Sequence, residues 1–237
     1  MFETLFDFQT IRIILALIML ILGSIVDIWK REIHDYYWIG FGGAGIVLAF
    51  LNPNIMTQLL TIGIALIIAP FVIVIWRIGL FGGADAFALI ALAVIAPMAT
   101  ITDNQISPFT TLSNAALLFI IPFLFNLFRN IILQLRGKNI FEGFDESFSK
   151  KIIASFMGYK SKNPKFAFSI EKMEKGKKKL DLAIHHAENQ EFCTTPNTWI
   201  TPGIPYLLLI AGGFIIQLIH GDIILNQFFD SGFQLPI

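Results

Sequence analysis

The sequence predicts an all-α membrane protein, with six transmembrane helices and a small insert of β or mixed α/β structure between the fifth helix and the sixth. Hydrophobic residues make up 55% of the 237 residues and charged residues only 14%, whereas a soluble domain has about 25% charged residues. The mean hydropathy of +0.70 agrees with this class. The apolar residues also form runs close to the length of about 20 residues that a spanning helix needs.

Six such runs follow one another along the chain, separated by short polar turns or by the one long insert. The predicted spans are residues 8–26, 36–51, 59–76, 84–100, 111–135 and 204–219. Asn52, Pro53 and Asn54 form a turn signal between the second span and the third. Pro70 is expected to kink the third span, because proline removes a backbone hydrogen bond and its ring collides with the preceding turn.

The lysine and arginine residues set the orientation of these spans in the plasma membrane. With six spans, sixteen of the seventeen fall on one side, and only Arg12 lies on the other, where its side chain is expected to reach the interface. The richer side is then cytoplasmic, because cytoplasmic loops carry an excess of Lys and Arg. We therefore expect a five-helix membrane domain over residues 1–135, a soluble cytoplasmic insert over 136–199, and the sixth helix with a short external tail over 200–237.

The predicted insert is basic, with twelve Lys and Arg residues against eight Asp and Glu residues. Its run KMEKGKKKL, residues 172–180, is expected to bind anionic lipid headgroups, at roughly 1 kcal/mol per basic residue near the surface; guiding a substrate is the alternative role. Residues 164–173 alternate enough to predict a strand. No cofactor, metal or nucleic acid is expected to bind, since Cys193 is the only cysteine and the adjacent His185 and His186 cannot face one way on a helix.

The fourth predicted span opens with three glycines and an aspartate, in the segment GLFGGADAFALIAL at residues 79–92. Asp85 is expensive to keep in this apolar run, because an aspartate near the bilayer centre costs roughly 2.5–3.5 kcal/mol, and such a residue is functional by default. The alternative is that Gly82 and Gly83 form a turn and that Asp85 only caps the helix.

A second carboxylate, Asp27, closes the first predicted span. The predicted topology brings Asp27 and Asp85 to the same, cytoplasmic edge of the membrane. Two carboxylates in one site can act as general base and general acid, which is how a water is activated for attack on an amide in aspartic proteolysis. Which aspartate is the base stays open, because such a pair titrates as a unit.

Three segments of the chain resemble one known family. The residues GGAD at 82–85 resemble the GxGD motif of the membrane aspartyl peptidases, with Ala84 in place of the second motif glycine. The residues DIWKREIHD at 27–35 are similar to the D-x-x-K-x-x-I-x-D region of the archaeal preflagellin and prepilin peptidases. The segment TPGIPYLLLIAGGF, from Thr201, is similar to the start of their last helix, and the three matches come in the family's order.

The resemblance implies an aspartic endopeptidase that removes short N-terminal leader peptides from preflagellin-like or prepilin-like precursors at the cytoplasmic edge of the membrane. It implies no metal and no cofactor. In this sequence the catalytic residues would be Asp27 and Asp85, and the motif and supporting residues would be Gly82, Gly83, Ala84, Lys30 and Asp35.

Two alternatives from other classes remain. A proton-coupled transporter could use two intramembrane carboxylates, although transporters usually place their sites near the midplane of the membrane, whereas both aspartates here lie at one edge. A non-enzymatic membrane subunit of a filament-assembly machine is the other alternative. It predicts that both aspartates can be replaced without loss of function.

Overall fold

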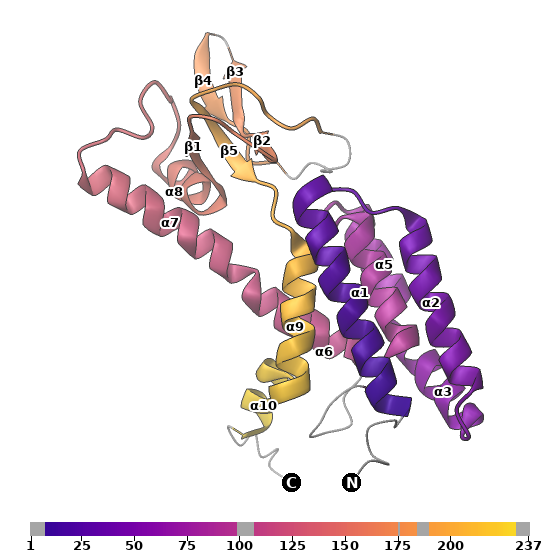
Figure 1. Ribbon diagram of the computed structural model, residues 1–237. Helices are drawn as coiled ribbons and strands as arrows, with labels where there is room; N and C mark the ends of the chain where they lie inside the picture. The colour runs from indigo at the N-terminus through magenta and orange to yellow at the C-terminus, as the bar shows by residue number, and fades with distance from the viewer. Residues whose placement is uncertain (1–7, 99–106, 175, 184–189, 231–237) are drawn as a thin grey trace. The chain divides into compact units, whose positions relative to one another are not determined.

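The computed structural model describes residues 8–98, 107–174, 176–183 and 190–230. The chain forms two compact units (Figure 1). Unit 1 comprises Met1–Leu118 and Pro205–Ile237, and unit 2 comprises Phe119–Ile204.

Unit 1 is helical in its described residues. Its helices are α1 (Phe8–Lys30), α2 (Asp35–Phe50), α3 (Ile55–Ala65), α4 (Ile68–Arg77), α5 (Gly83–Ile95), α6 (Ser107–Leu118), α9 (Tyr206–His220) and α10 (Ile223–Asp230). The described residues of unit 2 form helices α7 (Ile120–Leu135) and α8 (Phe148–Met157) and five short strands.

Three helical stretches in the described part of the chain are long and apolar enough to cross a membrane: Phe8–Lys30, Ile55–Arg77 and Ser107–Leu135. Helices α5 and α9 are apolar but shorter, below the ~17 residues that a span usually needs. The protein is therefore mostly helical with three candidate membrane spans, which agrees with the predicted class. The number of six spans stays a prediction.

Two of the predicted spans are interrupted just before a proline. The break between α3 and α4 includes Leu66, which stands four positions before Pro70. The break between α6 and α7 follows Leu118, which stands four positions before Pro122. Proline has no N–H for the carbonyl group four residues earlier, and its ring collides with that carbonyl. The first break agrees with the expected kink, and the second divides the predicted fifth span into two helices.

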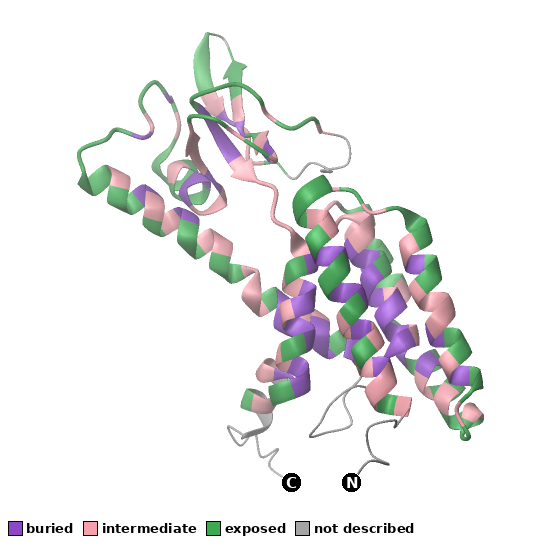
Figure 2. Cartoon of the chain, in the orientation of Figure 1, coloured by how far each residue is buried: buried purple, intermediate pink, exposed green. Residues whose placement is uncertain are grey.

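Helix α5 forms the centre of unit 1, where it contacts α1, α2, α3, α4, α6 and α9. It is apolar on nearly all sides, as a helix that is surrounded by others must be. Its buried residues are Asp85, Ala86, Ala88, Leu89, Ala91, Leu92, Ala93 and Ile95. Figure 2 shows that the outer helices of unit 1 instead carry much exposed surface, and large apolar side chains such as Ile39, Ile67 and Phe71 contribute to it. An apolar surface of this kind suits contact with lipid.

Arg12 joins three helices at the end of α5, and it does not reach the interface as expected. Its side chain is only 4% exposed. Its Nη1 group donates hydrogen bonds to the carbonyl oxygens of Val94 at 3.2 Å and Ile95 at 2.7 Å, and its Nη2 group donates to Gly45 of α2 at 3.2 Å. The last carbonyl groups of a helix lack partners inside the helix, and a cation also suits the negative end of its dipole. These carbonyl groups explain why Arg12 is held inside the bundle.

Helices α6 and α9 are joined by a buried polar network. The Thr111 hydroxyl donates to Gln217 Oε1 at 2.6 Å, and Gln217 Nε2 donates to the Ser107 hydroxyl at 2.9 Å. The two backbones also approach closely, because a Cβ added at Gly213 would lie 2.5 Å from the carbonyl oxygen of Thr111. This network fixes α9, whose first residue, Tyr206, lies close to the site described below.

Unit 2 combines a helix pair with two small sheets. Asn130 of α7 donates hydrogen bonds to the carbonyl oxygens of Ser155 and Gly158, at 3.0 and 2.7 Å. It thereby supplies hydrogen-bond donors to carbonyl groups at the C-terminal end of α8. The antiparallel three-stranded sheet has the order β1 (Tyr159–Ser161), β5 (Thr198–Pro202), β2 (Ala167–Ser169), and a hairpin pairs β3 (Glu171–Glu174) with β4 (Lys177–Leu180). The predicted strand over 164–173 corresponds to β2 and the first part of this hairpin.

The core of unit 2 is built around Trp199. Its side chain is fully buried, its indole Nε1 group donates to the carbonyl oxygen of Ile140 at 2.9 Å, and its ring stacks on Phe141 with 4.6 Å between centroids. A buried tryptophan usually finds such a partner for its N–H. Trp199, Ile140 and Phe141 all belong to the insert that the sequence predicts over residues 136–199.

Candidate active site

Asp27 occupies the last turn of α1 and is half-buried. The helix ends three residues later, and Arg31 follows with a positive φ of 58°, the left-handed conformation in which many helices terminate. The Arg31 N–H donates to the carbonyl oxygen of Asp27 at 3.0 Å. The charge of Arg31 also attracts the Asp27 carboxylate. The end of α1 therefore holds the backbone of Asp27 firmly.

Asp85 occupies the first turn of α5 and is only 8% exposed. Its Oδ2 atom accepts a hydrogen bond from the Gly82 N–H at 3.1 Å. Glycine has no side chain that could cap the helix, and the aspartate three residues later supplies a side-chain bond at this terminus. The positive end of the helix dipole also favours a carboxylate here. The capping role that we weighed for Asp85 is thus present.

The two aspartates come together although they are far apart in the sequence. The end of α1 and the start of α5 lie at the same end of unit 1 (Figure 1), and the charges of Asp27 and Asp85 repel each other. Asp85 therefore caps its helix and also lies within electrostatic range of a second carboxylate. A pair of this kind can divide acid and base roles between its members.

The remaining predicted site residues lie around this pair. Gly83 is the first residue of α5, and Ala84 is half-buried in its first turn. Lys30 ends α1 and Asp35 begins α2, and both are exposed. The structure thus buries neither Lys30 nor Asp35 beside Asp85.

Sequence analysis missed the contribution of Tyr206, at the start of α9. Its ring lies 4.8 Å from that of Phe81, the residue before Gly82, and its phenol lies close enough to Asp85 for the carboxylate charge to act on it. The segment from Thr201 resembles the start of the family's last helix, but no pattern within it singles out this tyrosine.

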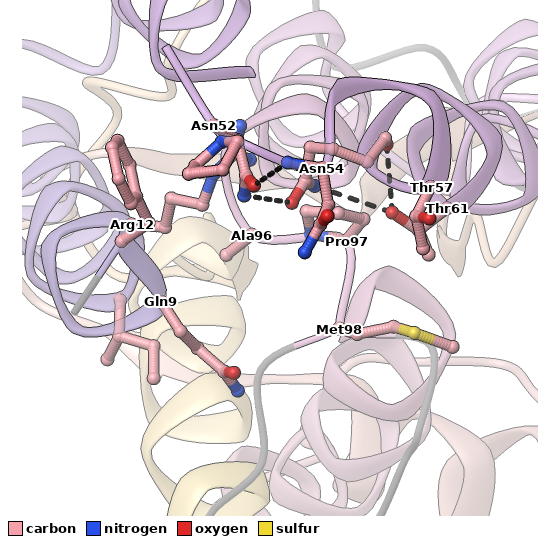
Figure 3. Close-up of a pocket in the computed structure, with 13 residues that line it drawn as sticks. Gln9, Arg12, Asn52, Asn54, Thr57, Thr61, Ala96, Pro97 and Met98 are labelled. Atoms are coloured by element: carbon pink, nitrogen blue, oxygen red, sulfur yellow. Dashed lines mark hydrogen bonds between the residues drawn. The ribbon is translucent and has the colours of Figure 1, made fainter. Parts of the chain in front are cut away.

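A cavity of about 470 Å³ lies at the opposite end of unit 1. Its lining includes Gln9, Arg12, Asn52 and Ala96, and Figure 3 shows the polar side chains around it, with the Asn52 side chain bonded to the backbone N–H of Asn54. Arg12 precedes Asp27 by four turns of α1, or about 22 Å along the helix. This cavity is therefore separate from the two aspartates.

Comparison with known proteins places this arrangement in a family. Residues 14–131 match the model of the type IV leader peptidase family, and residues 140–223 match that of the archaeal peptidase A24 C-terminus, type II. The chain belongs to the type IV leader peptidase family. The first match contains both Asp27 and Asp85, and the second covers most of unit 2 and α9. The family predicted from the sequence is thereby confirmed.

Three curated members of this family are similar to the chain over nearly its whole length. The preflagellin peptidase of Methanocaldococcus jannaschii is 25% identical over 92% of this chain and 97% of its own length. Those of Methanococcus maripaludis and Methanococcus voltae are 25% and 26% identical, over 91% and 90% of this chain and 97% and 96% of their own lengths.

Proposed function

We propose that this member of the type IV leader peptidase family is an aspartic endopeptidase that removes short N-terminal leader peptides from preflagellin-like or prepilin-like precursors. The observation that carries the proposal is the meeting of two carboxylates, Asp27 and Asp85, from different helices at one end of unit 1. The family match and the named relatives support the choice of substrate.

In the proposed mechanism the two carboxylates hold one proton between them, because two adjacent carboxylates are costly to ionise together. The ionised member takes a proton from a water while the water oxygen attacks the carbonyl carbon of the scissile bond. The other member protonates the carbonyl oxygen, which gives a tetrahedral diol. The C–N bond then breaks as the pair gives a proton to the amine nitrogen and takes one from a hydroxyl group of the diol, so the pair is left with one proton, as before.

The proposed topology has six spans, with the insert on the cytoplasmic side and both ends of the chain outside. Asp27 and Asp85 then lie at the cytoplasmic edge of the plasma membrane. A precursor with a hydrophobic segment after its leader would present the scissile bond at this depth. The excess of positive charge on the inner side supports this orientation, and contacts between the insert and anionic lipids are part of the proposal.

The test is a cleavage assay. The purified protein in detergent is incubated with a preflagellin-type or prepilin-type precursor, and the precursor mass is measured. We expect loss of the leader peptide with the parent protein and with Glu142→Gln, which removes an exposed carboxylate of unit 2, outside the unit that carries the aspartate pair. A parent protein that leaves every such precursor intact would favour the transporter or assembly-subunit alternatives.

A further inference from the structure

The first turn of α9 lies directly against the face of α1 that carries Asp27. Residues four positions apart share one face of a helix, so Gly23 lies one turn below Asp27. A Cβ added at Gly23 would come within 2.9 Å of Leu207 Cδ2. Glycine at this position therefore lets the start of α9 approach α1 closely, next to the proposed site.

The same turn of α9 also contacts the segment that leads into α5. The rings of Tyr206 and Phe81 lie 4.8 Å apart at an interplanar angle of 36°, and both side chains pack against the central core of unit 1. Phe81 directly precedes Gly82, the residue that donates its N–H to Asp85. The first turn of α9 thus lies against α1 through Leu207 and against the segment before α5 through Tyr206.

We infer that Tyr206 is a third catalytic residue, whose hydroxyl group donates a hydrogen bond to the scissile carbonyl oxygen of the substrate as the tetrahedral intermediate forms. This inference rests on the proposed function. Negative charge grows on that oxygen during attack, and a donor already in place stabilises it. One carboxylate takes a proton from the water while the other carboxyl group delivers its proton to this oxygen. A phenol beside them supplies a second donor to the oxygen without adding charge, and it keeps its own proton throughout.

The test compares Tyr206→Phe with Tyr37→Phe. Phenylalanine at 206 keeps the ring against Phe81 and removes only the hydroxyl group. Loss of one such donor typically lowers kcat by about 10²–10³-fold, and we expect a fall in that range with KM within twofold of the parent. Tyr37 donates its hydroxyl to the carbonyl oxygen of Met19 at 2.6 Å, so its variant loses a comparable buried bond. It should lower the thermal midpoint while leaving kcat unchanged.

A second variant tests the inference even if Tyr206→Phe fails to fold. Incorporation of 3-fluorotyrosine at position 206 keeps the shape of the side chain and keeps its hydroxyl donor. This protein should therefore retain a kcat within a few-fold of the parent, whereas Tyr206→Phe should not.

Three results would overturn the inference: parental kcat in Tyr206→Phe, a rise in KM alone, or a kcat that is as low with 3-fluorotyrosine as in Tyr206→Phe. Each of them leaves the proposed function intact if Asp27→Asn and Asp85→Asn are inactive. Activity in those aspartate variants would instead refute the proposed function itself.

Discussion

At the scale of single residues, Asp85 serves two purposes at once. It caps α5 through the Gly82 N–H, and its charge interacts with that of Asp27 at the end of α1. The capping bond fixes the position of the carboxylate before substrate arrives, and a fixed orientation is a large part of what an active site supplies. Gly82 matters for the same reason, since a Cβ at this position would lie 3.3 Å from Asp85 Oδ2.

Gly82→Ala should therefore lower activity more than stability. The added methyl group presses on Oδ2 and displaces the carboxylate by a few tenths of an ångström, for which we expect a drop in kcat of about tenfold, in line with the sensitivity of catalysis to small misplacements. Gly63→Ala is the matched control, because nothing lies within 4 Å of a Cβ added there. It should keep parental activity and raise helix stability by about 0.5–1 kcal/mol. Equal kcat in both variants would show that the fit around Oδ2 is unimportant.

At the scale of elements, the short helix α5 depends on its neighbours at both ends. Asp85 satisfies its first turn, and Arg12 satisfies its last carbonyl groups from α1. Arg12 thereby links α1 and α5 at the end opposite to the aspartates. The sequence alone could not predict this burial, since the position of Arg12 near the start of a span fits a side chain that reaches water equally well.

Arg12→Met should destabilise unit 1. Methionine leaves the carbonyl oxygens of Val94, Ile95 and Gly45 without their donor, and each buried polar group left without a partner costs about 1–3 kcal/mol. Thermal unfolding in detergent measures the loss. Arg77→Met is the control, because Arg77 is exposed at the end of α4, and its midpoint should stay within a degree or two of the parent. Equal midpoints in the two variants would contradict the assigned role of Arg12.

The insert should lose stability in acid through Glu146, whose side chain is only 4% exposed. Burial alone raises the pKa of Glu146, but the Leu180 N–H at 2.9 Å and the Lys150 ammonium at 3.1 Å outweigh it and leave the pKa below its ordinary value. A carboxyl group whose pKa is lowered by folding stabilises the fold above its unfolded pKa, about 4.3 for glutamate. That contribution disappears as the pH falls through the lower, folded value.

Trp199 fluorescence, in a variant whose three other tryptophans are replaced by Phe, should report this transition below about pH 4. Glu146→Gln should unfold more easily at pH 7 and lose less additional stability on acidification. A parental acid profile in Glu146→Gln would exclude this carboxyl group as the cause.

At the scale of the whole molecule, composition and charge predict the class well. The membrane character, the mostly helical fold and the family follow from the long apolar runs and from three short segments. The tertiary features could not be predicted from the sequence. Pro122 was visible in the sequence, but only the structure shows α6 and α7 as separate helices on either side of Phe119. The sequence alone shows Tyr206 as an ordinary first residue of an apolar helix, and only the structure shows its ring against Phe81 and its phenol within range of the Asp85 charge.

Cysteine labelling tests the proposed topology of the whole chain. Single cysteines placed at Lys162 in the insert and at Asn104 in the loop after the fourth predicted span, in a Cys193→Ser background, should react differently with an impermeant reagent on intact cells. We expect labelling at 104 and none at 162, because the positive charge of the insert favours the cytoplasmic side. Labelling at 162 from outside would reverse the orientation and move the aspartates to the outer edge.

The central claim is that Asp27 and Asp85 form one catalytic pair, and precursor cleavage by matched asparagine variants at equal membrane abundance tests it most directly. Asparagine keeps the shape of the side chain but cannot exchange a proton. Asp27→Asn and Asp85→Asn should each lose nearly all activity, and the double variant should be little worse, because members of a catalytic unit are not additive. Both single variants should still fold and insert, since neutralising one of two adjacent carboxylates relieves repulsion. Near-parental cleavage by either single variant would contradict the pair.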